Sequence, residues 1–198
     1  MKEGRLTRHV RNLAVATGLV ICGGASHTLA QADHQHPAGL MPPMTLEMKA
    51  KANALIKAVR EATAPYQTPD ALPRDYQLLF GCVGGDVGAM GLHYVNLGLV
   101  GDGEIDINKP EIVLFEPLPN GKRKITGADY LVYKDDWDAK HPDGPPMLGG
   151  QLFHLFESPN RFGLPAFYTL HVWAWKDNPN GTFSNWNPDV SCDGFNGG

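Results

Sequence analysis

The sequence predicts an α+β domain in which a long N-terminal helix packs on a curved antiparallel β-sheet, as a cone-like fold or a small open barrel. Two observations support this prediction. One stretch with helical periodicity is followed by short runs of strand character, each bounded by Gly, Pro, Asn or Asp. The breaks between these runs hold no second long amphipathic helix, so the strands should pair antiparallel rather than through helical crossovers.

The predicted helix begins at Thr45 and ends before Pro65. Proline cannot continue a helix, because it lacks an N–H donor and its ring collides with the preceding turn. The apolar residues of this segment recur at helical spacing and form one stripe, namely Met48, Ala52, Leu55, Ile56, Val59 and Ala62. We therefore expect the stripe to cover one face of the sheet.

The predicted strands are separated by hairpin-sized turns and cover residues 89–97, 111–116, 128–134, 151–156 and 167–176. A further apolar run begins at Tyr76, which gives five or six strands. In the last strand, alternate residues point to the same side. Because both of its sides are largely apolar, we expect this strand to be central and His171 to be sheltered.

Residues 1–32 have the pattern of a secretory signal peptide. Four basic residues precede an apolar run over residues 13–21, and Ala30-Gln-Ala32 fits an A-x-A cleavage site. Cys22 lacks the small preceding residue of a lipoprotein signal, so cleavage near Ala32 is favoured over lipid attachment. The sequence therefore predicts a secreted or periplasmic protein.

Two further regions follow the predicted signal. Residues 33–44 contain three prolines and show no periodicity, so we expect a flexible arm, and residues 45–198 should form a single domain. The arm carries His34, His36, Met41 and Met44, and imidazole with thioether is a ligand set that suits copper. The simpler interpretation, which we favour, is a solvated tail.

The charge balance indicates which partners to expect. The chain has 17 Lys+Arg and 21 Asp+Glu; removing residues 1–32, with four basic residues and one acidic, leaves 13 against 20, a net charge of −7. Such an acidic protein is a poor candidate for binding nucleic acid or anionic membranes. No apolar run of about 18 residues follows the signal, so no membrane span is expected. A small molecule or a metal ion is the expected partner.

Two cysteines, Cys82 and Cys192, follow the predicted signal. An even number in an oxidising compartment favours a disulfide, and closing a loop of roughly 110 residues would stabilise the fold by about 4–5 kcal/mol in the chain-entropy model. The alternative is a pair of thiolate metal ligands. It is disfavoured because the two cysteines belong to no closely spaced motif.

The candidate site comes from strand alternation. His93, His171 and Glu116 each share the side of a strand with apolar neighbours, and so do Asp129 and His154. A carboxylate on an apolar face is costly without a cation, a donor or a metal as partner. We therefore predict that His93, Glu116 and His171 bind one transition metal ion, which zinc, copper, iron or manganese would satisfy. Asp129 and His154 are expected as additional ligands or as hydrogen-bond partners of the ligands.

Other interpretations remain open at this point. The compact metal motifs His-x-His and His-Glu-x-x-His are absent from the predicted domain, and a buried histidine can simply be hydrogen-bonded to a carboxylate. A metal-free module would hold a small ligand in a pocket lined by Trp173, Trp175 and Tyr94. A structural role in the cell envelope is a third alternative. No catalytic residue and no reaction are predicted.

Three stretches together resemble a group of uncharacterised exported bacterial proteins. They are Gly88-Ala-Met-Gly-Leu-His-Tyr-Val-Asn96, Pro110-Glu-Ile-Val-Leu-Phe-Glu-Pro117, and the segment from Leu170-His-Val-Trp-Ala-Trp to Trp186-Asn-Pro-Asp-Val-Ser-Cys192. The resemblance spans most of the chain after the predicted signal. It implies export and a single domain, and it transfers no activity.

Overall fold

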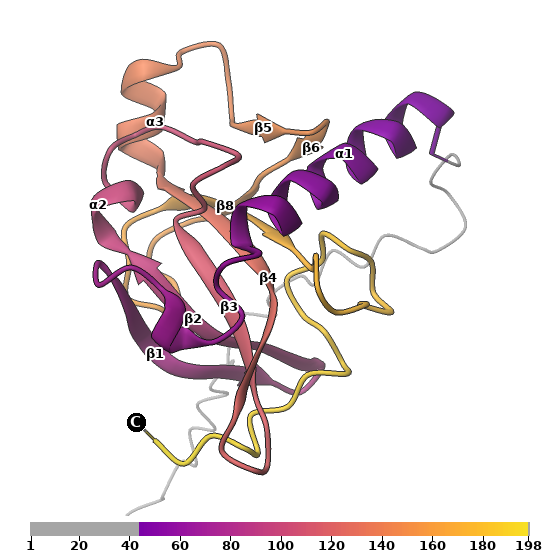
Figure 1. The fold of residues 1–198 in the computed structure, drawn as a ribbon. Coiled ribbons are helices and arrows are strands. Elements are labelled where there is room, and N and C mark those ends of the chain that lie inside the picture. The colour runs from indigo at the N-terminus through magenta and orange to yellow at the C-terminus, as the bar shows by residue number, and fades with distance from the viewer. Residues whose placement is uncertain (1–43, 198) are drawn as a thin grey trace, which may run out of the picture. The chain divides into compact units, whose positions relative to one another are not determined.

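The structure, a computed structural model, describes residues 44–197, in which helices pack with a curled antiparallel sheet (Figure 1). The predicted mixed α+β class is thus confirmed. The predicted signal peptide and His34, His36 and Met41 lie outside the described residues. None of the helices in the described part of the chain has the length and apolar character needed to span a bilayer.

Helix α1 spans Leu46–Thr63. Thr45 caps its N-terminus, since the threonine hydroxyl accepts a hydrogen bond of 3.1 Å from the backbone N–H of Met48. The buried positions of the apolar stripe are Ala52, Leu55 and Val59. Leu55 and Val59 pack on a sheet face that consists of Ala128, Tyr130, Val132, Tyr168, Leu170 and Val172.

The main sheet has six strands in the order β1-β2-β3-β4-β8-β7, and all neighbours are antiparallel. The strands are β1 (Tyr76–Gly85), β2 (Gly88–Asn96), β3 (Ile112–Pro117), β4 (Arg123–Tyr133), β7 (His154–Phe156) and β8 (Phe167–Val172). A second sheet pairs β5 (Met147–Leu148) with β6 (Gln151–Leu152). Short helices η1 (Pro69–Ala71), α2 (Leu97–Val100) and α3 (Lys134–Lys140) lie in the connections.

Strand β8 is shorter than the sequence pattern predicts. It ends at Val172, because the next backbone groups turn to other partners: Trp173 donates to the carbonyl of Thr182, and Trp175 donates to that of Thr126. The aromatic residues after Val172 therefore belong to an irregular tail. This tail folds back along the sheet, where Asn187 forms a β-bridge with Ala89.

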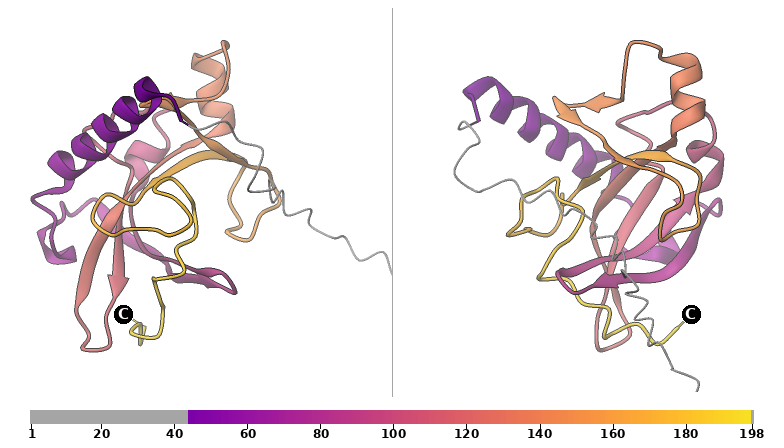
Figure 2. Two further views of the ribbon diagram at one scale, coloured as in Figure 1. Left: turned by 90° about the vertical axis from the view of Figure 1, so that its right-hand side faces the viewer. Right: turned by 180° about the vertical axis from the view of Figure 1, so that it is seen from behind.

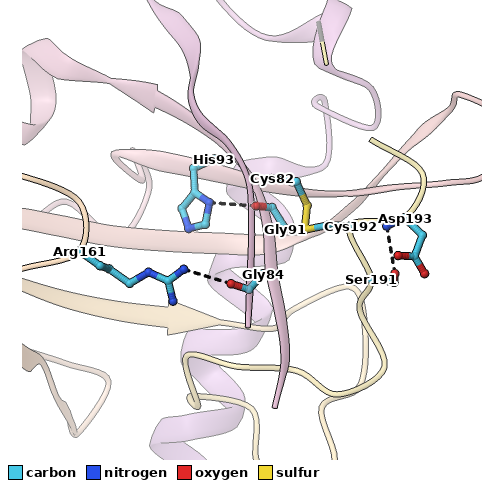
Figure 3. The surroundings of a disulfide bond; sticks show 8 residues. All are labelled: Cys82, Gly84, Gly91, His93, Arg161, Ser191, Cys192 and Asp193. Carbon is cyan, nitrogen blue, oxygen red and sulfur yellow. Dashed lines mark hydrogen bonds between the residues drawn. A yellow bond between two sulfur atoms is a disulfide. The ribbon is translucent and has the colours of Figure 1, made fainter. Parts of the chain in front are cut away.

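The C-terminal tail is linked covalently to the first strand. Cys82 and Cys192 form a disulfide with 5.7 Å between their Cα atoms, as the sequence predicts (Figure 3). Together with the β-bridge at Asn187, the disulfide fixes the tail beside the β1–β2 hairpin. The disulfide and the β-bridge therefore hold in place the hairpin that carries His93.

The sheet curls, and α1 lies on its outer side (Figure 2). Its two edge strands, β1 and β7, are not paired with each other. Residues 157–166, which follow β7, approach β1, and the guanidinium of Arg161 donates a 3.1 Å hydrogen bond to the carbonyl of Gly84 (Figure 3). The inner side of the curled sheet holds the candidate site.

Candidate metal centre

Three potential metal ligands meet on the inner side of the sheet. They are His93 on β2, Asp129 on β4 and His171 on β8, and the atoms that they offer all lie within 4.8 Å of one another. All three side chains are buried, with exposed fractions of 6%, 2% and 3%. Two imidazoles and one carboxylate form a ligand set that suits several transition metals.

The curl of the sheet brings the two histidines together. Strands β3 and β4 lie between β2 and β8, which would separate the backbones by about 14 Å in a flat sheet. The ring centroids of His93 and His171 are nevertheless only 5.7 Å apart. Gly127 permits a close approach of β4 and β8, since a Cβ there would lie 2.0 Å from the carbonyl oxygen of Val172.

His171 lacks the hydrogen bonds that a buried imidazole needs. It is the cross-strand partner of Asp129, and Nδ1 lies 3.3 Å from the Asp129 Oδ1 atom, but without the angle of a hydrogen bond. Within residues 44–197, neither ring nitrogen finds a partner. Leaving a buried polar group unpaired costs about 1–3 kcal/mol, and a partner bound at these two nitrogens would remove this cost.

The ring of His93 is oriented by its own strand. Nδ1 lies 3.2 Å from the Gly91 carbonyl oxygen, and an N–H donated there leaves the lone pair on Nε2 for an ion (Figure 3). Gly91 has φ of 88°, and a Cβ at this position would lie 2.5 Å from the Phe115 carbonyl oxygen. Glycine is thus required where the acceptor of His93 is positioned.

Asp129 is held by a neighbouring hydroxyl. Thr169 donates a hydrogen bond of 2.5 Å to Oδ1, which fixes the carboxyl group. Burial raises the pKa of Asp129 to about 6, so the group is mainly ionised at pH 7. Sequence alternation had placed Thr169 on the side of His171, but it could not show which carboxylate the hydroxyl would meet.

Burial also determines the charge of the two histidines. It lowers the pKa of His93 to about 4, with a further contribution from His171, and it lowers the pKa of His171 to about 3. Both imidazoles are therefore neutral at pH 7. Metal ions bind neutral imidazole and ionised carboxylate, so each group is in the form that coordination requires.

Binding one ion requires the three ligand atoms to move closer together. In a tetrahedral site with bonds of about 2.0–2.2 Å, two ligand atoms lie about 3.3–3.6 Å apart. The atoms offered by His93, Asp129 and His171 lie within 4.8 Å of one another, so a pair at this limit would have to close by roughly 1.2–1.5 Å. Rotations of the three side chains would supply this movement.

Glu116 does not lie in this cluster, although the sequence pattern had favoured it as the carboxylate ligand. Both of its oxygens bind the amino group of Lys176, at 3.0 and 2.8 Å. The reason is its position along β3: Glu116 is four residues from Ile112, the partner of Asp129, which is about 13 Å in an extended strand. Alternation identifies the side of a strand and not the position along it.

The remaining candidates are also placed. His154 is exposed on β7, opposite Thr169 in the ladder. Trp173 donates to the carbonyl of Ser184, and Trp175 donates to the hydroxyl of Thr63 on the α1 side of the sheet. Tyr94 packs edge-to-face on Phe115, outside the inner face. None of these three aromatic residues lines the pocket beside the cluster.

An apolar pocket lies next to the His–Asp–His cluster. It offers about 30 Å³ to the centres of water-sized molecules, within about 380 Å³ of space that includes the solvent at its mouth. The pocket was not predicted, because its wall comes from residues far apart in the sequence. His93, Asp129, His171 and Thr169 supply its polar groups. Its apolar lining consists of Phe80, Met90, Val95, Ile112, Leu131, Phe156, Phe162, Leu164 and Phe167.

Comparisons with known proteins add no assignment. No protein-family model matches the chain, and no curated protein or solved structure shows significant similarity to it.

Proposed function

We propose that this protein binds one divalent transition metal ion through His93, Asp129 and His171. The observation that supports the proposal best is His171, a fully buried imidazole with two unpaired nitrogens beside an anionic carboxylate. A purely structural histidine would be expected to donate one N–H to that carboxylate. A bound ion would instead accept the lone pair of each imidazole and balance the charge of Asp129.

We further propose that the protein acts outside the cytoplasm, after cleavage near Ala32. The basic and apolar segments of residues 1–32 support export. The disulfide between Cys82 and Cys192 is consistent with an oxidising compartment. The metal would then be acquired in the periplasm or outside the cell.

The test measures metal content without an affinity tag that could itself bind metal. We expect the purified protein to retain about one equivalent of a transition metal by mass spectrometry of the elements, or to gain it on incubation with zinc, copper, iron(II) or manganese. His171→Ala should abolish binding. The matched control is His141→Ala, which removes a partly exposed histidine that stacks on Trp137.

A clear negative result would overturn the proposal. If the wild-type protein holds no metal and shows no thermal stabilisation with any of the four ions, His93, Asp129 and His171 are not a metal site. If His171→Ala and His141→Ala lose metal equally, the ion binds elsewhere. A metal-free protein that binds small apolar molecules in the same pocket would favour the ligand-binding alternative.

A further inference from the structure

We infer that the exchangeable ligand of the metal ion is a small monoanionic molecule with an aromatic or apolar body, such as an aromatic carboxylate or phenolate. The inference rests on the proposed metal site and identifies the class of molecule that would bind there. It follows from two features, the charge of the site and the chemistry of the pocket wall.

The proposed site with its ion would carry a positive charge. A divalent ion bound to two neutral imidazoles and one carboxylate carries a net charge of +1. Apart from Asp129 and the two neutral histidines, the pocket lining consists of apolar residues and Thr169. A net charge in apolar surroundings is costly, so a ligand with one negative charge is favoured over a neutral ligand.

The aromatic wall of the pocket favours a ligand with an apolar or aromatic body. Four phenylalanine rings line the pocket, and they form a connected cluster: Phe156 stacks on Phe167 at 5.0 Å, and Phe162 lies 6.1 Å from both. Aromatic rings arranged in this way offer both faces and edges to a further ring. A ligand that carries only a small anion would leave this wall in contact with water.

Phe80 supports the same conclusion at the edge of the pocket. It has φ of 64°, a conformation that residues other than glycine rarely adopt, and 49% of its surface is exposed. Such strain costs about 1–3 kcal/mol and is concentrated at functional sites. The strained backbone holds the ring 5.7 Å from Phe162, where it lines the pocket. A ligand that covers this exposed ring would bury its apolar surface.

The experiment uses the protein loaded with cobalt(II), whose visible absorption reports changes in coordination. Benzoate, acetate and benzyl alcohol are titrated separately. We expect benzoate to change the spectrum and to bind at least about tenfold more tightly than acetate, because its ring is buried against the phenylalanines. Benzyl alcohol has the same ring without the anion and should leave the spectrum unchanged.

Two variants and one control distinguish the contribution of the phenylalanine wall from that of the metal ion. Phe162→Ala should weaken benzoate about tenfold and leave acetate and cobalt affinity unchanged. Phe80→Gly should weaken benzoate while keeping or raising thermal stability, since glycine relieves the strain at φ of 64°. Phe183→Ala is the control, because Phe183 packs against the core under α1 and does not line the pocket.

The outcomes distinguish this inference from the proposed function. If cobalt binds but benzoate and acetate bind equally, the inference is overturned and the metal site stands. If benzoate binds equally well to the metal-free protein, coordination by the anion is excluded. If no metal binds at all, both the proposed function and this inference fail.

Discussion

Asp129 and His171 face each other directly across β4 and β8, with 3.3 Å between Oδ1 and Nδ1 and no hydrogen bond to satisfy the imidazole. Replacing both groups by apolar residues would remove two desolvation costs from the core. The pair is therefore better explained by binding than by stability. This distinction leads to predictions in which stability and metal affinity change in opposite directions.

Asp129→Asn should lower metal affinity and raise the stability of the metal-free protein. Loss of the anionic ligand should weaken metal binding by roughly 100-fold or more, as for other buried charge pairs that lose one partner. The raised pKa of Asp129 shows that burial disfavours its ionised form, so a neutral amide should be tolerated better at pH 8. Calorimetric titration with zinc and chemical denaturation measure the two effects.

Glu116→Gln is the matched control for that substitution. Glu116 is also a largely buried carboxylate, but its partner is Lys176. We expect unchanged metal affinity and a small loss of stability, because Lys176 loses its counter-ion. A larger effect of Glu116→Gln than of Asp129→Asn on metal affinity would show that the ligand set is misassigned.

His93 and His171 should each lower the stability of the metal-free protein as the pH falls from about 6.5 to 4. An unfolded histidine titrates near pH 6.5, whereas burial lowers the pKa of His93 to about 4 and that of His171 to about 3. The unfolded chain thus binds protons that the folded chain does not, which lowers the free energy of unfolding by up to about 1.4 kcal/mol per pH unit for each histidine.

Asp129 and Glu111 oppose this trend, because burial raises their folded pKa values to about 6 and about 8. The two pairs of groups nearly cancel in the wild type, so the contribution of His171 is measured by difference. His171→Gln should gain stability relative to the wild type as the pH falls from 6 to 4.5, by up to about 1.4 kcal/mol per pH unit in urea denaturation with EDTA. An equal pH dependence for the variant and the wild type would show that His171 does not titrate in this way.

Glu111→Gln should stabilise the protein at alkaline pH. Burial raises the pKa of Glu111 to about 8, and its Oε2 atom accepts a 3.2 Å hydrogen bond from the Leu131 N–H. The folded chain therefore keeps a proton between about pH 4.5 and 8 that the unfolded chain loses, so stability falls as the pH rises through this range. The variant should lack this decline in denaturation experiments between pH 5 and 9. A decline as steep as that of the wild type would contradict the assignment.

Gly91→Ala should destabilise the fold by roughly 2–4 kcal/mol and also weaken metal binding. The added methyl would lie 2.5 Å from the Phe115 carbonyl oxygen, and moving the strand displaces the acceptor of His93. Gly121→Ala is the control, since its φ of 77° is similarly positive but no atom lies within 4 Å. The difference in unfolding free energy between the two variants isolates the steric conflict.

Reducing the disulfide should lower the free energy of unfolding by about 4–5 kcal/mol in the chain-entropy model. Cys82 and Cys192 are 110 residues apart in the sequence, so the bond restricts most of the described chain when it unfolds. Denaturation with and without reductant measures the loss. A Cys82→Ala, Cys192→Ala double variant should match the reduced protein and should not respond to reductant.

The sequence predicts which side chains share a face of the sheet, but not the register in which neighbouring strands pair. Alternation along each strand correctly grouped His93 and His171 with apolar neighbours. It could not rank Asp129 above Glu116, because that choice depends on the register of β3 against β4. This register shifts between Leu114 and Phe115, and no pattern in the local sequence predicts such a shift.

The apolar pocket was beyond prediction for a related reason. Its phenylalanines, Phe80, Phe156, Phe162 and Phe167, come from β1, β7, a loop and β8, and they meet only because the sheet curls. Single-sequence patterns report local periodicity, whereas curl follows from twist, register and close contacts such as that at Gly127. The sequence suggested Trp173 and Trp175 as pocket residues, but their indole N–H groups donate to the Ser184 carbonyl in the tail and to the Thr63 hydroxyl on α1.

Because the edge strands β1 and β7 do not pair with each other, no hydrogen bonds between strands close this side of the pocket. Across this gap, Arg161 binds the Gly84 carbonyl and lies 5.2 Å above the Trp186 ring. These are side-chain contacts, so the gap can widen or narrow while every strand pair that carries a metal ligand stays intact. At the proposed metal site, substitutions in residues 157–166 alone would therefore change the size of the ligand that fits, without changing the residues that hold the ion.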